Sequence, residues 1–345
     1  MSLNNLNAQK ILILRFSSFG DVTESLSIPS FIHQHWPQSE IHWAVRSDLS
    51  SLLKNHPHIF QIHAYDKKTG LMGLIKLAFQ LRKLNFTHVY DAHNSTRSRL
   101  IALITTFLKG NELLRKSQFR WKRFLLFKFR INHYEMPFSG QRDLLKPLQK
   151  WEMPFKLPEA PQLFLDSQLK TIFEKLNFPK GRWIACAPSA AFELKRWPLE
   201  YWEQLASSML KKLPEDFHFI FLGGPEDHFI QKIIALNPSR LHNFAGKLSL
   251  TESAKVIEQS ELTISNDTGL LHVAEQLGRP AIALMGPAPF GYPSRQSTQI
   301  LELQLECKPC SKHGQGPCVN AKYHECLRGI SPQLVEQHAL KKLAL

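Results

Sequence analysis

The chain has 345 residues, a length that suits two domains of ordinary size. Hydrophobic residues make up 43% and charged residues 21%, as in soluble globular proteins, and no apolar run is long enough to cross a bilayer. The formal net charge of +14 favours an anionic partner: nucleic acid, an acidic membrane surface or a phosphorylated substrate. Residues 1–7 lack the basic and apolar regions of a signal peptide, so we expect a cytoplasmic protein.

The first half of the chain alternates short apolar runs with stretches of helical period. Strands are predicted at residues 10–15, 41–45, 60–65 and 86–91. Helices are predicted to begin at Asp21 and to cover residues 71–84. This βαβα order predicts a doubly wound parallel sheet, whose ligands bind outside the carboxyl ends of the strands. The first strand is not followed by G-x-G-x-x-G, so the usual dinucleotide-binding fingerprint is missing.

Residues 109–130 interleave basic and aromatic side chains, with Arg120, Lys122 and Arg123 around Trp121. The stretch suits anionic lipid headgroups, because basic side chains bind phosphates and aromatic side chains enter the interface. It also suits single-stranded nucleic acid, whose bases stack on aromatic rings. A third interpretation is an ordinary segment with a solvated basic edge. We favour the first interpretation, an anionic membrane surface without nucleic acid.

A proline-rich segment separates the two halves of the chain. Residues 147–161 contain four prolines and no clear period, as is typical of a linker. Beyond it, strands are predicted at residues 182–187 and 217–222, with helices at residues 199–212, 229–236 and 253–259. Two similar α/β halves predict two domains, residues 1–160 and 161–331, facing a cleft in which a ligand binds.

Residues 262–286 predict a strand, a sharp turn, a helix and a further strand. Asp267 is expected at the N-cap, Thr268 and Gly269 open the helix, and Gly278 ends it. The unpaired N–H groups and the positive dipole end of such a helix suit a diphosphate, and His272 lies within about one turn of them. The alternative is that Asp267 only caps a helix and His272 is a polar surface residue.

Three further clusters fall at strand ends. Asp21 follows Ser17, Ser18 and Gly20 after the first strand, placed as a general base would be. Lys195 and Arg196 are adjacent cations that suit phosphate neutralisation, while Gly224 lets backbone approach a ligand and Glu226 accepts hydroxyl hydrogens. Each cluster alone is explained by a turn or a cap. Together they favour a transferase that uses a nucleotide-activated donor.

Four of the five cysteines crowd into the spacing Cys307-x2-Cys310-x7-Cys318-x7-Cys326. A cytoplasmic location argues against structural disulfides, which leaves a metal site or plain thiols. We expect a structural zinc on these four cysteines, with His313 and His324 as alternative ligands. A catalytic metal is not expected there, because a four-thiolate site leaves no open position.

The chain resembles glycosyltransferase family 9, the ADP-heptose:lipopolysaccharide heptosyltransferases. The matching pieces occur in the family's order over nearly the whole chain: Arg15-Phe-Ser-Ser-Phe-Gly-Asp-Val22, Lys195-Arg-Trp-Pro198, Gly223-Gly-Pro-Glu226, Asp267-Thr-Gly-Leu-Leu-His272, and a cysteine-bearing tail at Cys307-Lys-Pro-Cys310. The resemblance implies an α/β protein of the GT-B fold, with two Rossmann-like doubly wound parallel-sheet domains. The first would bind the acceptor and the second the nucleotide sugar. A C-terminal helix, residues 332–345, would pack back on the first domain.

The resemblance also implies roles for individual residues. Asp21 matches the catalytic base, and Lys195 contacts the donor phosphate and takes part in catalysis. The acceptor-binding residues are expected to be Ser17, Ser18, Gly20, Arg120, Lys122 and Arg123. The donor-binding residues are expected to be Lys195, Arg196, Gly224, Glu226, Asp267, Thr268, Gly269 and His272.

The implied reaction is the inverting transfer of a heptose from ADP-heptose to the inner core of lipopolysaccharide, on a phosphorylated lipid A-Kdo acceptor. It would need no metal cofactor and would occur at the cytoplasmic face of the inner membrane. One alternative is another GT-B nucleotide-sugar transferase with a different sugar or acceptor, because Ala288-Pro-Phe replaces the family's usual Thr-x-Pro loop. A remote alternative is a non-catalytic basic nucleic-acid-binding protein, which would have no need of Asp21 or of the Asp-Thr-Gly-x-x-His segment.

Overall fold

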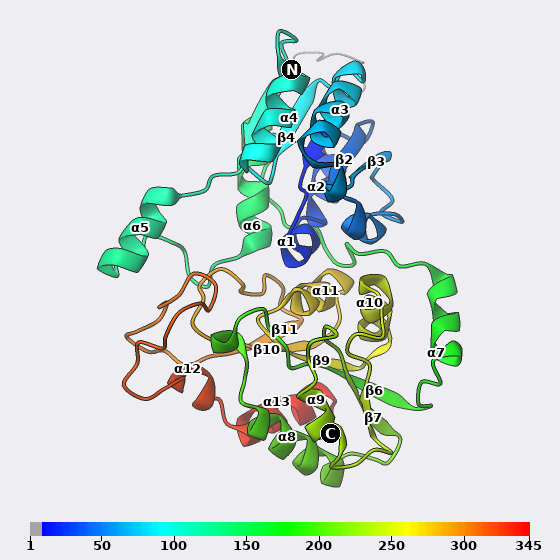
Figure 1. Ribbon diagram of the computed structural model, residues 1–345, viewed down its shortest axis with the longest axis vertical. Helices are drawn as coiled ribbons and strands as arrows, with labels where there is room; N and C mark the ends of the chain where they lie inside the picture. The colour runs from blue at the N-terminus through cyan, green and yellow to red at the C-terminus, as the bar shows by residue number, and fades with distance from the viewer. Residues whose placement is uncertain (1–8) are drawn as a thin grey trace. The chain divides into compact units, whose positions relative to one another are not determined.

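The computed structural model describes residues 9–345, which divide into two compact units (Figure 1). The first unit comprises the described residues up to Gln118 together with Gln141–Phe164, and the second comprises Phe119–Gly140 and Leu165–Leu345. The expected domain boundary at residue 160 lies near the end of the first unit's second segment. Residues 1–7, which carried the argument against a signal peptide, lie outside the described residues.

The first unit is built on a parallel sheet with the strand order β3-β2-β1-β4-β5. Its strands are β1 Lys10–Leu14, β2 Glu40–Arg46, β3 Gln61–Tyr65, β4 His88–Asp91 and β5 Glu112–Arg115. The helical elements are α1 Phe19–Glu24, α2 Ser27–His35, η1 Ser47–Leu52, η2 Lys67–Thr69, α3 Gly70–Lys83, α4 Thr96–Thr106, α6 Gly140–Leu145 and η3 Lys146–Trp151. The central strand β1 is fully buried from Ile11 to Leu14, as expected for a strand covered on both faces of a parallel sheet.

The second unit is built on a parallel sheet with the strand order β11-β10-β9-β6-β7-β8. Its strands are β6 Arg182–Ala187, β7 Phe217–Phe221, β8 Leu241–Asn243, β9 Leu262–Asn266, β10 Ala281–Leu284 and β11 Thr298–Leu301. The helical elements are α5 Arg120–Phe129, η4 Ser167–Lys170, α7 Thr171–Lys175, η5 Glu193–Lys195, α8 Leu199–Lys212, α9 Ile230–Ile234, α10 Leu250–Gln259, α11 Gly269–Leu277, α12 Glu325–Arg328 and α13 Pro332–Lys342. Two parallel α/β sheets are therefore present, as predicted.

The C-terminal helix α13 packs within the second unit, and its expected packing on the first domain is wrong. Val335 and Ala339, four residues apart on one helix face, are fully buried in the core of the second unit. α13 lies beside α8, where Glu336 accepts a hydrogen bond from Ser208 at 2.9 Å and pairs with Lys212 at 2.9 Å (Figure 1). The apolar stripe and this buried carboxylate fix α13 to α8.

Residues 119–140 also group with the second unit, although the sequence placed them in the first domain. The rings of Phe127, Tyr134 and Phe138 each lie 5.1–6.3 Å from the ring of Phe290. The Arg130 guanidinium donates to the Pro309 carbonyl at 2.7 Å. These aromatic and polar contacts between distant segments decide where the basic stretch packs.

None of the helices between residues 9 and 345 combines the length and apolar character that a membrane-spanning segment needs.

Candidate active site

Asp21 lies in the first turn of α1, directly after the carboxyl end of β1. One carboxylate oxygen pairs with Arg15 at 2.5 Å, and the other accepts hydrogen bonds from the Ser18 backbone N–H at 3.0 Å and the Ser18 hydroxyl at 2.8 Å. The Asp21 side chain is 43% exposed, so solutes still reach it. Of the predicted residues, Ser17 and Ser18 precede α1 and Gly20 lies in its first turn, and Ser18 is the one that hydrogen-bonds to the Asp21 carboxylate.

The charge state of Asp21 follows from these contacts. Desolvation by itself raises the pKa of a carboxyl, but the Arg15 charge and the Ser18 hydrogen bonds outweigh it and lower the pKa of Asp21 to about 2. The charge of Lys116 acts in the same direction. Asp21 is therefore an anion at neutral pH, able to accept a proton, although its low pKa makes it a weak base.

Two residues beside Asp21 are not among the predicted ones. The buried Arg15 guanidinium donates to the Ala92 carbonyl at 2.7 Å, which aims it at Asp21. His93 accepts a hydrogen bond from the Phe16 backbone N–H at 3.4 Å, and burial, followed by the Arg15 charge, lowers the pKa of His93 to about 4. The position of His93 could have indicated it, because His93 follows β4 and β4 is the neighbour of β1 in the sheet.

In the second unit, the turn after β9 leads into α11. Thr268 is the N-cap, because its hydroxyl accepts a hydrogen bond from the Leu270 backbone N–H at 3.1 Å. The expected N-cap, Asp267, has a different partner: its carboxylate pairs with the Lys195 ammonium at 2.6 Å. Gly269 opens α11 as predicted, and Gly278 ends it in the left-handed conformation with φ of +70°.

The loop that carries Lys195 is fixed by the last residue of β9. Asn266 is fully buried, donates to the Pro188 carbonyl at 2.7 Å and accepts from the Trp197 backbone N–H at 3.2 Å. The two strands involved, β9 and β6, are neighbours in the sheet. Lys195 and the start of α11 therefore meet at the carboxyl edge of one sheet, and Asn266 is a further residue that the sequence patterns did not single out.

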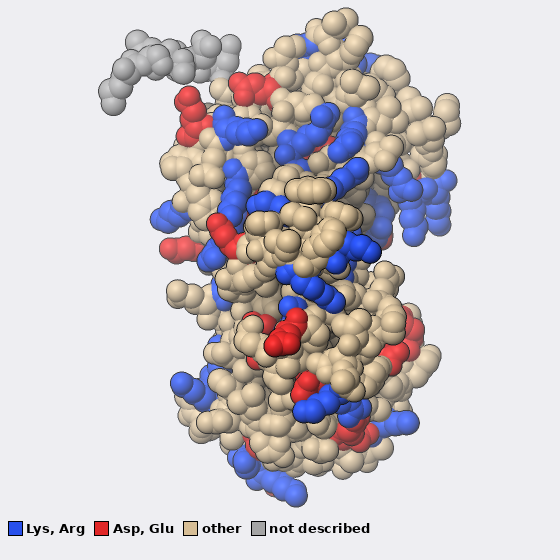
Figure 2. Space-filling view, turned by 90° about the vertical axis from the view of Figure 1, so that its left-hand side faces the viewer, with Lys and Arg blue, Asp and Glu red and all other residues tan. Residues whose placement is uncertain are grey.

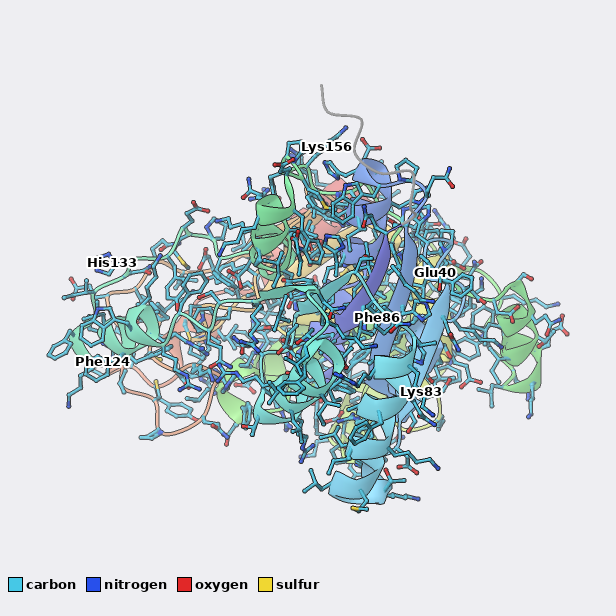
Figure 3. All side chains as sticks on the ribbon, turned by 90° about the horizontal axis from the view of Figure 1, so that it is seen from above. Glu40, Lys83, Phe86, Phe124, His133 and Lys156 are labelled. Carbon is cyan, nitrogen blue, oxygen red and sulfur yellow. The ribbon has the colours of Figure 1, made fainter. Side chains whose placement is uncertain are left out.

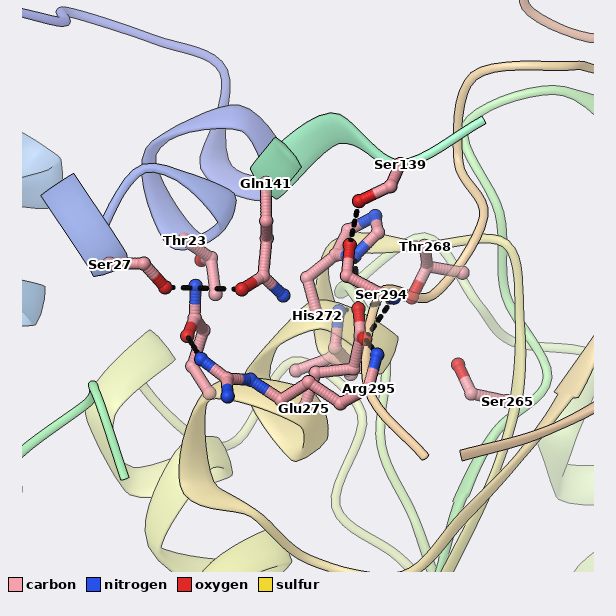
Figure 4. A network of polar contacts seen from close by, with 12 residues as sticks. Thr23, Ser27, Ser139, Gln141, Ser265, Thr268, His272, Glu275, Ser294 and Arg295 are labelled. Atoms are coloured by element: carbon pink, nitrogen blue, oxygen red, sulfur yellow. Dashed lines mark hydrogen bonds and ion pairs between the residues drawn. The ribbon is translucent and has the colours of Figure 1, made fainter. Parts of the chain in front are cut away.

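His272 is buried inside the second unit and does not stand at the surface. Its Nδ1 lies 3.1 Å from a carboxylate oxygen of Glu275 (Figure 4). The other Glu275 oxygen accepts the backbone N–H groups of Ser294 at 2.5 Å and Arg295 at 2.9 Å. His272 is therefore tied through Glu275 to the loop before β11, which also holds the Ser139 hydroxyl 2.5 Å from the Ser294 hydroxyl (Figure 4).

The glycine turn after β7 is organised by Asp227, a buried residue that was not predicted. Asp227 accepts hydrogen bonds from the Gly224 backbone N–H at 2.8 Å and the Ser189 hydroxyl at 2.8 Å. Glu226 is exposed, and a Cβ added at Gly224 would lie 2.5 Å from its carboxylate. The turn therefore leaves Glu226 accessible to a ligand and joins the loops after β6 and β7.

Arg196 contacts its own loop. Its Nε donates to the Ala190 carbonyl at 2.9 Å, and its guanidinium lies 5.8 Å from the centre of the Phe229 ring. Arg120, Lys122 and Arg123, expected to bind the acceptor, belong to α5 in the second unit, whereas Ser17, Ser18 and Gly20 belong to the first.

The four clustered cysteines are free thiols in the structure. Burial raises the pKa of Cys326 to about 11, and burial and the neighbouring thiols also raise the pKa of Cys310. Within the described part of the chain, no three His, Cys, Asp or Glu side chains are arranged as metal ligands, so the geometry gives the expected zinc site no support.

Two parallel α/β sheets with charged loops at their carboxyl edges define the GT-B class of architecture. A family model for glycosyltransferase family 9 (heptosyltransferase) matches residues 74–324. The chain therefore belongs to this family and is a glycosyltransferase, as the sequence motifs predicted.

Known proteins agree with this assignment. The chain is 28% identical to lipopolysaccharide heptosyltransferase 1 of Campylobacter coli, over 81% of this chain and 84% of that protein. It is 25% identical to lipopolysaccharide heptosyltransferase 2 of Escherichia coli (strain K12), over 94% and 96% of the two chains.

Solved structures share the fold at lower sequence identity. A glycosyl transferase of family 9 from Veillonella parvula DSM 2008 superposes with a TM-score of 0.77 at 19% identity, covering 99% of this chain and 98% of that chain. The E. coli ADP-heptose lps heptosyltransferase II superposes with a TM-score of 0.73 at 22% identity, covering 97% and 99%. The predicted GT-B fold is thus confirmed.

Proposed function

We propose that this glycosyltransferase moves a heptose from ADP-heptose to the inner core of lipopolysaccharide, with a lipid A-Kdo molecule as acceptor and with inversion at the anomeric carbon. The names of the relatives support the sugar and the acceptor class. The observation that carries the proposal is the pair of charged motifs at the two sheet edges: ionised Asp21 in the first unit, and Lys195 with Asp267 at the start of α11 in the second.

Asp21 is the proposed base. It accepts the proton of the acceptor hydroxyl as that oxygen bonds to the anomeric carbon and the bond to the diphosphate breaks. One direct displacement of this kind inverts the anomeric centre. Arg15 and Ser18 keep the pKa of Asp21 near 2. Proton transfer to Asp21 is therefore favourable only late in the reaction, when bonding to the anomeric carbon has made the attacking hydroxyl group strongly acidic.

Lys195 and the N-terminus of α11 are the groups proposed to bind the leaving diphosphate. The leaving group gains negative charge as the sugar departs, and a positive group stabilises it most where water is excluded. The Lys195 side chain is 17% exposed and Asp267 only 5%, and the Thr268 and Gly269 backbone lies at the positive end of α11. The Lys195 ammonium and the N-terminus of α11 supply the positive charge that a metal ion supplies in other transferases, so we propose catalysis without a metal cofactor.

Glu226, Gly224, Arg196 and His272 complete the proposed donor site. Glu226 is exposed beside the glycine turn, where its carboxylate can accept hydroxyl hydrogens of the nucleoside. His272 is buried against Glu275, so its proposed contribution is to hold the loop around Ser294 and not to meet phosphate directly.

We also propose that the protein works in the cytoplasm and binds the anionic surface of the inner membrane through α5. Trp121 is 68%, Phe124 47% and Phe129 56% exposed on this helix. The Trp121 and Phe124 rings are stacked with centres 5.5 Å apart, and Phe124 lies at the periphery in Figure 3. Four of the ten residues of α5 are basic, namely Arg120, Lys122, Arg123 and Lys128, and Figure 2 shows the side of the chain from which this helix is seen. Exposed rings among basic groups suit a bilayer interface.

The test is the mass of the product. Purified protein is incubated with a panel of nucleotide sugars and truncated lipopolysaccharide cores, and products are analysed by mass spectrometry. A mass increase of one heptose with ADP-heptose on a Kdo-terminated acceptor is expected. Transfer of another sugar, or transfer only to a longer core, would support the alternative of a related GT-B transferase. No transfer with any pair would overturn the proposal.

A further inference from the structure

Residues 307–326, here called the cysteine loop, contact the short turn that carries Lys195. That turn, η5 (Glu193–Lys195), is a single 3-10 turn. His324 in the cysteine loop is buried, and its Nε2 donates to the Leu194 carbonyl at 2.9 Å. The Tyr323 hydroxyl donates to a Glu193 carboxylate oxygen at 3.3 Å. Two residues of η5 are thus held by segments about 130 positions away in the sequence.

The cysteine loop also packs against the Lys195 side chain itself. Gly314 has φ of +82°, and a Cβ added there would lie 2.6 Å from Cγ of Lys195. Backbone of the loop therefore fills the space beside the lysine stem, and only glycine fits. At the other end of the same side chain, the ammonium pairs with Asp267 at 2.6 Å. The Lys195 side chain is fixed at its backbone, at its stem and at its charged tip.

Thiol groups of the cysteine loop also make contacts within the loop. The His324 backbone N–H lies 3.2 Å from the Cys318 sulfur, and the Asn320 side-chain amide lies 3.4 Å from the Cys307 sulfur. Cys326 is buried in the core of the second unit. Of the four cysteines, Cys318 therefore contacts His324, a residue that holds η5, whereas Cys307 contacts a neighbouring part of the loop.

We infer that the cysteine loop is a positioning element for Lys195, with Gly314 and His324 as its positioning residues. A free lysine side chain loses rotamer entropy when it is immobilised on a ligand. A loop that immobilises the side chain beforehand removes part of that cost from binding. This inference rests on the proposed function, in that Lys195 is taken to bind the diphosphate of the donor.

The chain offers a matched pair of glycines for the test. Gly314 and Gly316 lie in the same loop with φ of +82° and +88°, so alanine carries a similar backbone penalty at both. A Cβ at Gly316 meets no atom within 4 Å, whereas a Cβ at Gly314 meets Lys195. Gly314→Ala is expected to weaken ADP binding about tenfold in calorimetry, with Gly316→Ala within about twofold of the natural protein.

A double-mutant cycle separates positioning of Lys195 from general damage. In a Lys195→Ala background, Gly314→Ala is expected to cause no further loss of ADP affinity, because the stem that it displaces is gone. A second pair avoids the glycine backbone: His324→Gln keeps a donor for the Leu194 carbonyl and is expected to retain ADP affinity, whereas His324→Leu is expected to lose it. His324 has a left-handed φ of +60°, so the glutamine and the leucine variant carry the same kind of backbone strain. Melting temperatures establish that each variant is folded.

Equal ADP affinity of Gly314→Ala and Gly316→Ala would overturn the inference, as would a Gly314→Ala effect that is fully additive with Lys195→Ala. Failure of the proposed function looks different. In that case the natural protein does not bind ADP, or Lys195→Ala binds it as well as the natural protein does.

Discussion

Asp21 lies at the carboxyl edge of the first sheet, and its ion pair with Arg15 keeps its carboxyl group deprotonated. Asp21→Asn removes the proton acceptor and preserves shape, so kcat is expected to fall by about two to four orders of magnitude while ADP binding is retained. Asp48→Asn is the control, because Asp48 is also paired with an arginine, at 2.5 Å to Arg46, and is expected to leave turnover unchanged. Near-normal turnover of Asp21→Asn would show that Asp21 is not the catalytic base.

Lys195 is the residue whose loss is expected to weaken the donor site most. Lys195→Ala removes a charged contact to phosphate and is expected to cost about 1.5–3 kcal/mol of ADP binding, measured by calorimetry. Lys212→Ala serves as the control, since that lysine forms an ion pair with Glu336 in the same unit and is 54% exposed. Unchanged ADP affinity of Lys195→Ala contradicts the proposed binding of the diphosphate.

At the scale of elements, α5 is expected to carry the binding to anionic membranes. Charge reversal of Arg120, Lys122 and Arg123 to Glu is expected to release the protein from anionic vesicles, at about 1 kcal/mol per residue, and raised salt should do the same. Vesicle sedimentation measures it. The control reverses three exposed lysines of the first unit, Lys67, Lys68 and Lys76, which changes the net charge equally. If both variants bind the vesicles equally well, α5 is an ordinary solvated segment and not a membrane-binding helix.

The cysteine loop is the second element with a testable expectation, a structural zinc on its four thiols. The sequence spacing predicts a structural site, whereas the described side chains show no metal-ligand arrangement. Elemental analysis of freshly purified, reduced protein is expected to find about one zinc per chain. Less than about 0.2 zinc per chain, with four titratable thiols, ends the zinc hypothesis.

At the scale of the whole molecule, stability is expected to fall on mild acidification. Burial lowers the pKa of His56, His63 and His93 to about 4, all in the first unit. The unfolded chain binds protons near pH 6.5 and the folded chain does not. The stability from each neutral histidine is therefore complete above pH 6.5 and is lost as the pH falls toward 4, at about 1.4 kcal/mol per pKa unit.

Urea unfolding at pH 7.5, 6 and 5 measures this loss. His56→Gln removes one titrating ring and keeps a donor for the Leu26 carbonyl, which His56 contacts at 3.1 Å, so its pH dependence is expected to be shallower. A free energy of unfolding that does not change between pH 7.5 and 5 contradicts the burial argument.

The order of the elements followed from local sequence. Apolar runs such as Ile11–Leu14 are buried strands, and Gly278 ends α11 because glycine adopts positive φ without strain. The predicted charged motifs also fall after the ends of parallel strands, as the βαβ rhythm requires. These features depend on residues close together in the chain, so the sequence by itself determined them.

Only the tertiary structure decided the pairings. Asp267 is drawn to Lys195, which leaves Thr268 as the N-cap of α11. The helix α13 packs on α8, and residues 119–140 join the second unit through the ring of Phe290. Such contacts join segments far apart in the sequence, and their energies depend on complementary shape and charge after the sheets have formed. Periodicity and spacing carry no information about which distant partner will be met.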